Sequence, residues 1–138
     1  MEPQLFAMLV SEEAVMLRRL EVALHQQGVR TSCARDRADA RRILSSEQVP
    51  NLIFTAASFR DGTWRDVVAM AKRTEPPRPV ILVTRLDEIS LYLEAMNEGA
   101  CDYIVPPFGA ADVAHIIRSS VQDCVAERGS LVSVAGAD

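Results

Sequence analysis

Short apolar runs alternate with amphipathic segments along most of the chain. Five runs are rich in β-branched or large apolar residues and are typical of buried strands. Between them, apolar residues recur every three or four positions, as they do in helices that pack through one face. The predicted strands cover residues 5–10, 29–34, 51–55, 80–84 and 102–105, and the predicted helices cover residues 14–27, 37–48, 63–73, 87–97 and 110–125. This alternation predicts an α/β fold, a doubly wound five-stranded parallel sheet with helices on both faces.

Local signals mark the ends of these elements. Gly28 is a natural helix stop, and Asp36 is suited to cap the helix that follows it. Asp61 and Gly62 predict a turn, and the proline-rich residues 75–79 cannot be helical. We expect one domain over residues 1–126 and a disordered tail or linker stub over residues 127–138, where the sequence has small residues and no period.

Composition narrows the classes of function. The chain has 138 residues, which is enough for one sizeable core, and 49% of them are hydrophobic. The sequence contains no run of 18 or more apolar residues, so it predicts no membrane span. The N-terminal stretch has Glu2 and no basic residue, unlike a signal peptide. We therefore expect a cytoplasmic domain with reduced cysteines. The net charge of -4 argues against nucleic acid as the partner of this domain alone.

The third predicted strand ends without a reactive group. In "NLIFTAASFRDGTW" the apolar run is followed by Thr55, Ala56, Ala57 and Ser58. In α/β proteins, ligands bind outside the carboxyl ends of the strands, so chemistry is expected at this junction. Methyl and hydroxyl groups occupy the place where a charged side chain would act.

Two segments carry a resemblance to a known family. The segment "NEGACDYIVPPF" is similar to the G-A-x-D-Y-x-x-K-P-F segment of response-regulator receiver domains, and "PNLIF…FRDGTW" is similar to their P-D-…-P-D-G segment. The resemblance covers about residues 4–126. It implies the flavodoxin-like strand order 2-1-3-4-5 and a role in bacterial two-component (phosphorelay) signalling, with the site between strands one and three.

The resemblance also implies which positions form the site. Receivers accept phosphate on an aspartate at the end of strand three, and that position is Ala56 here. Their acidic pair, which holds Mg²⁺, falls at Ser11 and Glu12, or at Glu12 and Glu13 if the first loop is one residue shorter. In receivers, a lysine just before the proline that follows strand five pairs with the acyl phosphate. That position is Pro106 here.

Two further positions keep the family's residue types. Thr84 ends strand four and Tyr103 lies in strand five, and in receivers this pair forms the switch that reads phosphorylation. The resemblance also implies a cis peptide bond before the last helix, so we predict that Pro106-Pro107 is cis.

These replacements predict a pseudo-receiver. Phosphoryl transfer needs a nucleophilic oxygen, a metal ion and a fixed cation. Ala56 supplies no oxygen and Pro106 supplies no charge, and Lys72, the single lysine, lies on the third predicted helix. We expect a non-enzymatic signalling module that binds a partner protein, with no Mg²⁺ or other cofactor.

Other interpretations stay open. A receiver could still switch through an atypical acceptor such as Ser58 or Asp61, or the vacated pocket of a flavodoxin-like domain could bind a small ligand. His25 and His115 lie on different predicted helices without metal-ligand spacing. Trp64 is a candidate either for packing or for a partner-facing anchor.

The predicted interface is the face that receivers use for signalling. It comprises roughly residues 87–97, 102–105 and 110–125. The fourth helix has more apolar residues than one core-facing stripe requires, so some of Leu91, Tyr92 and Leu93 must point outward. We expect this face to mediate homodimerisation or docking to a partner protein.

Overall fold

The predicted five-stranded parallel sheet is present. The computed structural model describes residues 5–84, 89–100 and 102–129, without the side chains of Ile89, Tyr92 and residues 121–129. The strands of the sheet are β1 (Phe6–Val10), β2 (Arg30–Ala34), β3 (Leu52–Ala56), β6 (Val80–Val83) and β7 (Asp102–Ile104). Their order is β2-β1-β3-β6-β7, and every neighbouring pair is parallel. This is the flavodoxin-like order that the sequence predicts.

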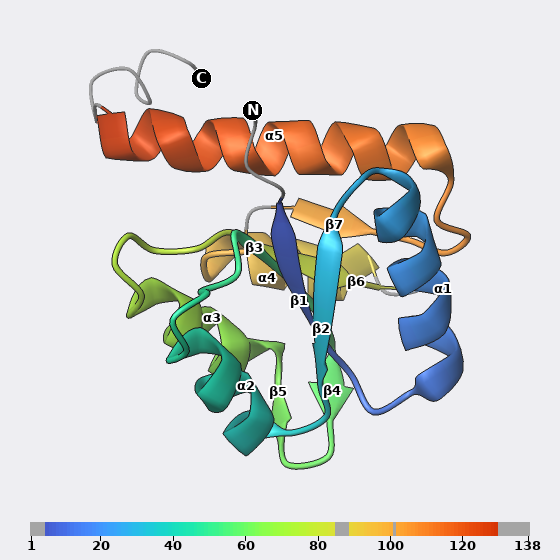
Figure 1. Ribbon diagram of the computed structural model, residues 1–138. Coiled ribbons are helices and arrows are strands. Elements are labelled where there is room, and N and C mark those ends of the chain that lie inside the picture. The colour runs from blue at the N-terminus through green and yellow to red at the C-terminus, as the bar shows by residue number, and fades with distance from the viewer. Residues whose placement is uncertain (1–4, 85–88, 101, 130–138) are drawn as a thin grey trace.

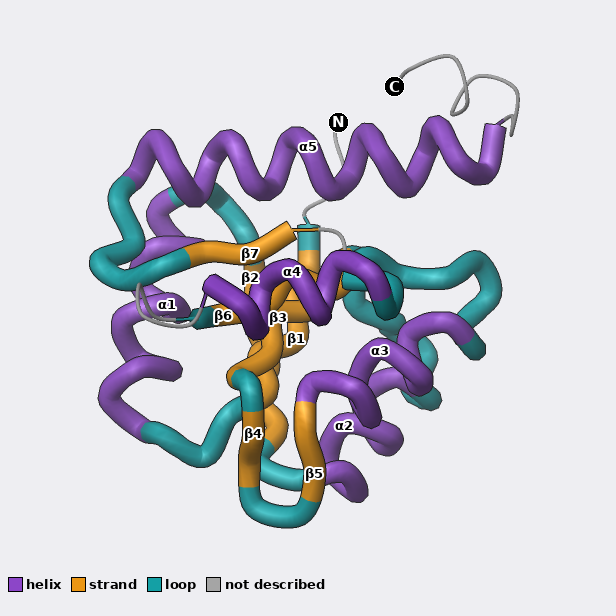
Figure 2. The backbone as a smooth tube through the Cα atoms, turned by 180° about the vertical axis from the view of Figure 1, so that it is seen from behind, coloured by secondary structure: helices purple, strands orange, loops and turns teal. Residues whose placement is uncertain are grey.

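Helices cover both faces of the sheet (Figure 1; Figure 2 gives the opposite view). They are α1 (Ala14–Gln26), α2 (Arg37–Leu44), α3 (Trp64–Lys72), α4 (Ile89–Asn97) and α5 (Ala110–Gly129). α1 and α5 pack on one face, and α2, α3 and α4 pack on the other. Within the described residues, no helix has both the length and the apolar character that crossing a membrane requires.

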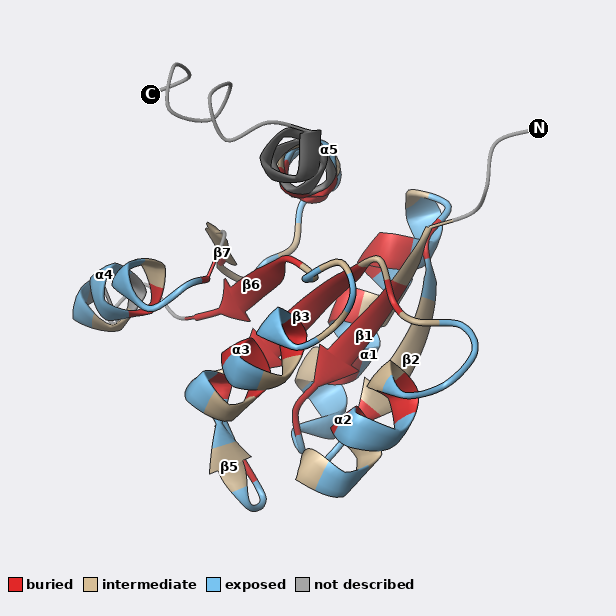
Figure 3. Ribbon diagram, turned by 90° about the vertical axis from the view of Figure 1, so that its left-hand side faces the viewer, coloured by how far each residue is buried: buried red, intermediate tan, exposed pale blue. Residues whose placement is uncertain are grey.

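Alternation along the central strands builds two cores. Leu9 and Phe54 point to the α1 and α5 side, and Met8 and Ile53 point to the α2 and α3 side. Because both faces are covered, the central strands are continuous apolar runs and are coloured as buried in Figure 3. β2 lies at the sheet edge and is more exposed, which explains its weaker sequence signal.

Three helix ends show why the local signals were informative. Gly28 has a φ of 78°, the left-handed conformation that ends α1. The Asp36 carboxylate accepts a hydrogen bond from the Asp39 N–H at 2.9 Å and caps α2. Thr63 and Asp66 form a capping box at the start of α3.

The structure differs from the predicted elements in three places. A two-stranded antiparallel hairpin, β4 (Ser58–Phe59) and β5 (Gly62–Thr63), replaces the expected simple turn. α2 ends at Leu44 rather than near residue 48, because the Ser46 hydroxyl donates to the carbonyls of Ile43 and Gln48 and favours a turn. α5 continues to Gly129, so the predicted domain boundary after residue 126 falls within this helix.

Truncation of the Phe54 side chain tests how much β3 contributes to the stability of the fold. Phe54 is 1% exposed and belongs to the core between the sheet and helices α1 and α5. We expect Phe54→Ala to lower the free energy of unfolding by about 3–5 kcal/mol, because it removes buried area and leaves a cavity. Val15→Ala is the matched control, since Val15 is 66% exposed and should change stability by less than about 0.5 kcal/mol. Urea unfolding followed by circular dichroism measures both, and equal losses would contradict this assignment of the core.

Candidate functional site

The carboxyl ends of β1, β3 and β6 bring the predicted site positions together. Val10 pairs with Thr55 across β1 and β3, so Ser11 and Ala56, one residue further on, are neighbours at this edge. Ala56 pairs with Val83 of β6, which Thr84 follows directly. The strand order reverses between β1 and β3, so this edge is the switch point at which doubly wound sheets bind ligands.

Ser11 has a structural role at the end of β1. Its side chain is buried, its N–H donates to the Ala34 carbonyl at 3.0 Å, and its hydroxyl accepts from the Glu13 N–H at 3.0 Å. The hydroxyl therefore holds the turn that leads into α1. Glu12 and Glu13 are both exposed. The residue directly after β1 is thus a serine, and Glu12 is the first carboxylate of the loop.

The end of β3 holds no charged side chain. Ala56 is the last residue of the strand and is half-buried. The buried Thr55 hydroxyl donates to the Ala56 carbonyl at 2.9 Å, and the Ala57 carbonyl accepts from the Trp64 N–H at 3.1 Å. These polar groups stabilise the turn from β3 into the hairpin, and none of them is a carboxylate.

Thr84 and Tyr103, the residues for which the resemblance implies a switch, lie on the β6 and β7 side of the sheet. Thr84 is buried, and its N–H donates to the Ile104 carbonyl at 3.0 Å, which extends the pairing of β6 with β7. Tyr103 is half-buried and packs against the core beneath α2, α3 and α4. The Pro106-Pro107 bond is cis, so that prediction is confirmed.

Lys72 lies at the wrong end of its helix to serve this edge. α3 begins at Trp64, directly after the hairpin, and ends at Lys72. Eight residues of helix separate the two by about 12 Å along the axis. The Lys72 ammonium instead donates to the Glu98 carbonyl at 3.4 Å.

The hairpin is attached to α2 through Asp61. The Asp61 carboxylate accepts from the Arg37 N–H at 2.9 Å and lies 3.6 Å from the Arg37 Nε. An anion at the first turn of a helix is favourable because the helix dipole is positive there. Asp61 is therefore engaged with α2, whereas Ser58 on β4 is exposed. The hairpin extends beyond the sheet at the carboxyl edge in Figure 1.

Trp64 and the histidines have no place in this site. Trp64 is 2% exposed and packs in the core, with the Arg65 guanidinium 4.6 Å from its ring centre, so the partner-anchor interpretation is wrong. His25 lies on α1 and His115 on α5, and both are exposed. Among the described residues, no group of three or more histidine, cysteine or acidic side chains could hold a metal ion.

Cys33 is a free thiol on β2. Burial, followed by the neighbouring Glu21 carboxylate, raises the pKa of the Cys33 thiol above its ordinary value. The thiol therefore stays protonated at neutral pH and packs as a small apolar group.

Sequence reasoning missed the hairpin and its attachment to α2. The hydrogen bond between Arg37 and Asp61 joins residues that are 24 positions apart, so no local pattern could indicate it. The spacing of Thr63 and Asp66 was the available signal for the helix start that follows the hairpin.

Comparisons with known proteins agree with this fold. The family model described as "Response regulator receiver domain" matches residues 7–118. The response regulator protein PilR of Pseudomonas aeruginosa is 24% identical over 84% of this chain, and RegA, a photosynthetic apparatus regulatory protein of Rhodovulum sulfidophilum, is 27% identical over 82%. The chain spans 26% of the length of PilR and 61% of that of RegA.

Solved structures share the fold. The signal receiver domain of an HD domain-containing protein from Pseudomonas fluorescens Pf-5 superposes with a TM-score of 0.79 at 25% identity, covering 95% of this chain and 96% of that one. NtrX from Brucella abortus superposes with a TM-score of 0.81 at 19% identity, covering 92% of this chain and 29% of that one. The sheet order and a family match over residues 7–118 agree, and the chain belongs to the response regulator receiver domain family.

Proposed function

We propose that this receiver domain signals through protein-protein contacts without aspartyl phosphorylation and without catalysing a reaction. The observation that carries the proposal is the position of Ala56. It ends β3 at the switch-point edge, where the family resemblance places the acceptor aspartate, and a methyl group cannot accept a phosphoryl group.

The surroundings of Ala56 support the same proposal. Mg²⁺ prefers octahedral oxygen coordination that includes carboxylates. Ser11 uses its hydroxyl to hold the Glu13 N–H, and Glu12 is exposed to solvent. Pro106, where the resemblance places the lysine, has neither a charge nor an N–H. The phosphate acceptor, the metal ligands and the lysine that the resemblance implies are thus all replaced or incomplete at this edge of the sheet. We infer that this edge has lost phosphoryl transfer.

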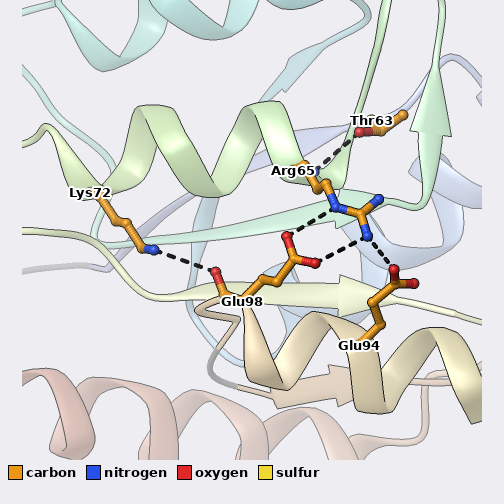
Figure 4. A network of polar contacts seen from close by, with 5 residues as sticks. All are labelled: Thr63, Arg65, Lys72, Glu94 and Glu98. Atoms are coloured by element: carbon orange, nitrogen blue, oxygen red, sulfur yellow. Dashed lines mark hydrogen bonds and ion pairs between the residues drawn. The ribbon is translucent and has the colours of Figure 1, made fainter.

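Contacts between α3 and the α4 segment favour a single conformation of the domain. Arg65 on α3 contacts one carboxylate of α4 and one directly after it: it pairs with Glu94, and its Nε lies 3.0 Å from Glu98 (Figure 4). Lys72 reaches the carbonyl of Glu98 from the other end of α3. Ala95 is buried beneath this network. Charge pairs and apolar burial both hold α4 against α3, which suits a domain that keeps one conformation.

The exposed side of α4 is the proposed contact surface. Leu93 is 59% exposed, whereas Leu91 is half-buried and packs against the core. The Tyr92 side chain lies outside the described residues. The prediction was that some of these three residues face outward, and Leu93 is the one on which the interface proposal now depends. A large apolar side chain in this position is suited to self-association or to docking a partner protein.

Acetyl phosphate tests the loss of phosphoryl transfer. We expect the purified chain, incubated with acetyl phosphate and Mg²⁺, to show no added phosphoryl group by intact-mass spectrometry, because Ala56 offers no oxygen nucleophile. A receiver that has its acceptor aspartate, treated in parallel, confirms that the phosphodonor is active. Addition of a phosphoryl group that Ser58→Ala or Asp61→Asn abolishes would instead support switching through an atypical acceptor.

Leu93→Glu tests the contact surface. We expect the wild-type chain to self-associate at high concentration in sedimentation experiments or to recover a partner from native cells. The substitution should weaken that association about tenfold or more, because a carboxylate would be buried without a partner. Val15→Glu is the matched control, since Val15 is 66% exposed, a fraction similar to that of Leu93, but lies on α1. If both variants behave as wild type does, the exposed side of α4 is not the interface.

The pH dependence of stability tests the attachment of α4. The Arg65 guanidinium, hydrogen-bonded to Glu98, lowers the pKa of the Glu98 carboxyl below its ordinary value. A carboxyl with a lowered folded-state pKa stabilises the fold above its unfolded pKa and loses that contribution as the pH falls through the folded value. We expect Glu98→Gln to lower the melting temperature at pH 7 and this difference to vanish between about pH 5 and pH 3.

The control for this measurement is Glu47→Gln. Glu47 is exposed in the loop after α2 and has no ion pair among the described residues. Its substitution should leave the melting temperature unchanged at both pH values. A Glu98→Gln effect that is the same at pH 7 and pH 3 would contradict a charge-based attachment.

A further inference from the structure

A cavity opens at the amino edge of the sheet, opposite the carboxyl edge that holds Ala56. It has a volume of about 420 Å³ and lies between the ends of α2 and α3 and the loops that lead into β3 and β6. These two loops enter the amino ends of neighbouring strands, and α2 and α3 lie side by side in Figures 1 and 3. The cavity is therefore separated from Ala56 by the length of β3.

Three guanidinium groups line this cavity. Arg41 lies in the last turn of α2, Arg73 caps α3, and Arg78 lies in the loop before β6. Among the described residues, none of the three takes part in an ion pair. Glu75 is the one carboxylate of the lining, so positive charge is in excess. This local excess contrasts with the net charge of -4 of the whole chain.

Helix dipoles explain only part of this arrangement. A cation at the carboxyl end of a helix is stabilised by the dipole, which accounts for Arg41 and Arg73. Arg78 also lies near this helix end, because its N–H donates to the Ala71 carbonyl in the last turn of α3 at 3.2 Å, but the dipole does not satisfy its guanidinium donors. The Nε of Arg78 is buried and has no hydrogen-bond acceptor among the described residues. A buried donor without an acceptor is costly, so a movement of the Arg78 side chain that brings this Nε to an anion in the cavity would be favourable.

Much of the remaining lining is apolar or already hydrogen-bonded. Leu44, Val49 and Met70 contribute apolar surface to the cavity. The hydroxyls of Ser46 and Thr74 both donate to backbone carbonyls at the ends of their own helices. The arginines are therefore the groups that could bind a negatively charged part of a ligand. The apolar side chains could contact an uncharged part of the same ligand.

We propose that this cavity binds a small amphiphilic organic anion, a molecule with a phosphate, sulfonate or carboxylate group and an apolar or aromatic body. The planar guanidinium fork is suited to bidentate contact with such groups. The volume lies within the range of about 300–1,000 Å³ that is typical of small-molecule sites. Binding here would join the two loops that precede β3 and β6, and it does not depend on phosphorylation at the opposite edge.

Nuclear magnetic resonance with 8-anilinonaphthalene-1-sulfonate as the probe tests the site. This molecule has a sulfonate and an aromatic body, and the 138-residue chain is labelled with ¹⁵N. We expect saturable shifts of the amides of residues 41–49 and 70–78, with a dissociation constant below about 1 mM. Inorganic phosphate, which lacks the apolar body, should bind at least about tenfold more weakly.

Two arginine variants separate this site from general dye binding. Arg78→Gln and Arg41→Gln should each weaken probe binding about tenfold, because each removes a charge-assisted contact. Arg41 is exposed, so the second variant retains the fold even if the first does not. Arg18→Gln is the control, since Arg18 is exposed on α1 away from the cavity.

The proposal is overturned by any of three results. These are shifts that do not saturate or map elsewhere, probe binding that both folded arginine variants retain at full strength, and inorganic phosphate that binds as tightly as the probe.

Discussion

The pairing of β3 with β1 on one side and β6 on the other determines where every candidate functional group lies. β3 is buried along its first four residues, and helices cover both of its faces. A slip of one residue would exchange the two faces and move Phe54 out of its core, so the register is strongly specified. With this register, Ser11, Ala56 and Thr84 must meet at one edge, whatever chemistry they have.

The two edges of the sheet consequently differ in chemistry. At the carboxyl edge, Ala56 and Ser11 contribute a methyl group and a hydroxyl group that is already hydrogen-bonded. A phosphorylatable receiver must hold several carboxylates close together there, and like charges in proximity oppose ionisation and folding. An alanine removes that repulsion. At the amino edge, by contrast, three arginines line one cavity, and none of them forms an ion pair with a described residue.

Much of the fold was readable because its signals are local. Apolar runs of four to six residues indicate strands buried on both faces, and Gly28 and Asp36 mark helix ends through their own backbone preferences. The position of Ala56 at the end of β3 also followed from the sequence, because it is counted along a single strand. The positions at which prediction was less accurate are helix ends such as Leu44, where side-chain hydrogen bonds compete with the helix.

The sequence by itself therefore determined the order of elements, the alternation of core faces and the absence of an aspartate and a lysine from the positions that the family resemblance indicates. Only the tertiary structure decided which distant side chains meet. Arg37 meets Asp61, and Arg65 meets Glu98, across 24 and 33 positions. Arg41 and Arg78 share a cavity because two loops enter neighbouring strands. Such contacts depend on how helices pack on the sheet, and no periodicity along the chain encodes that packing.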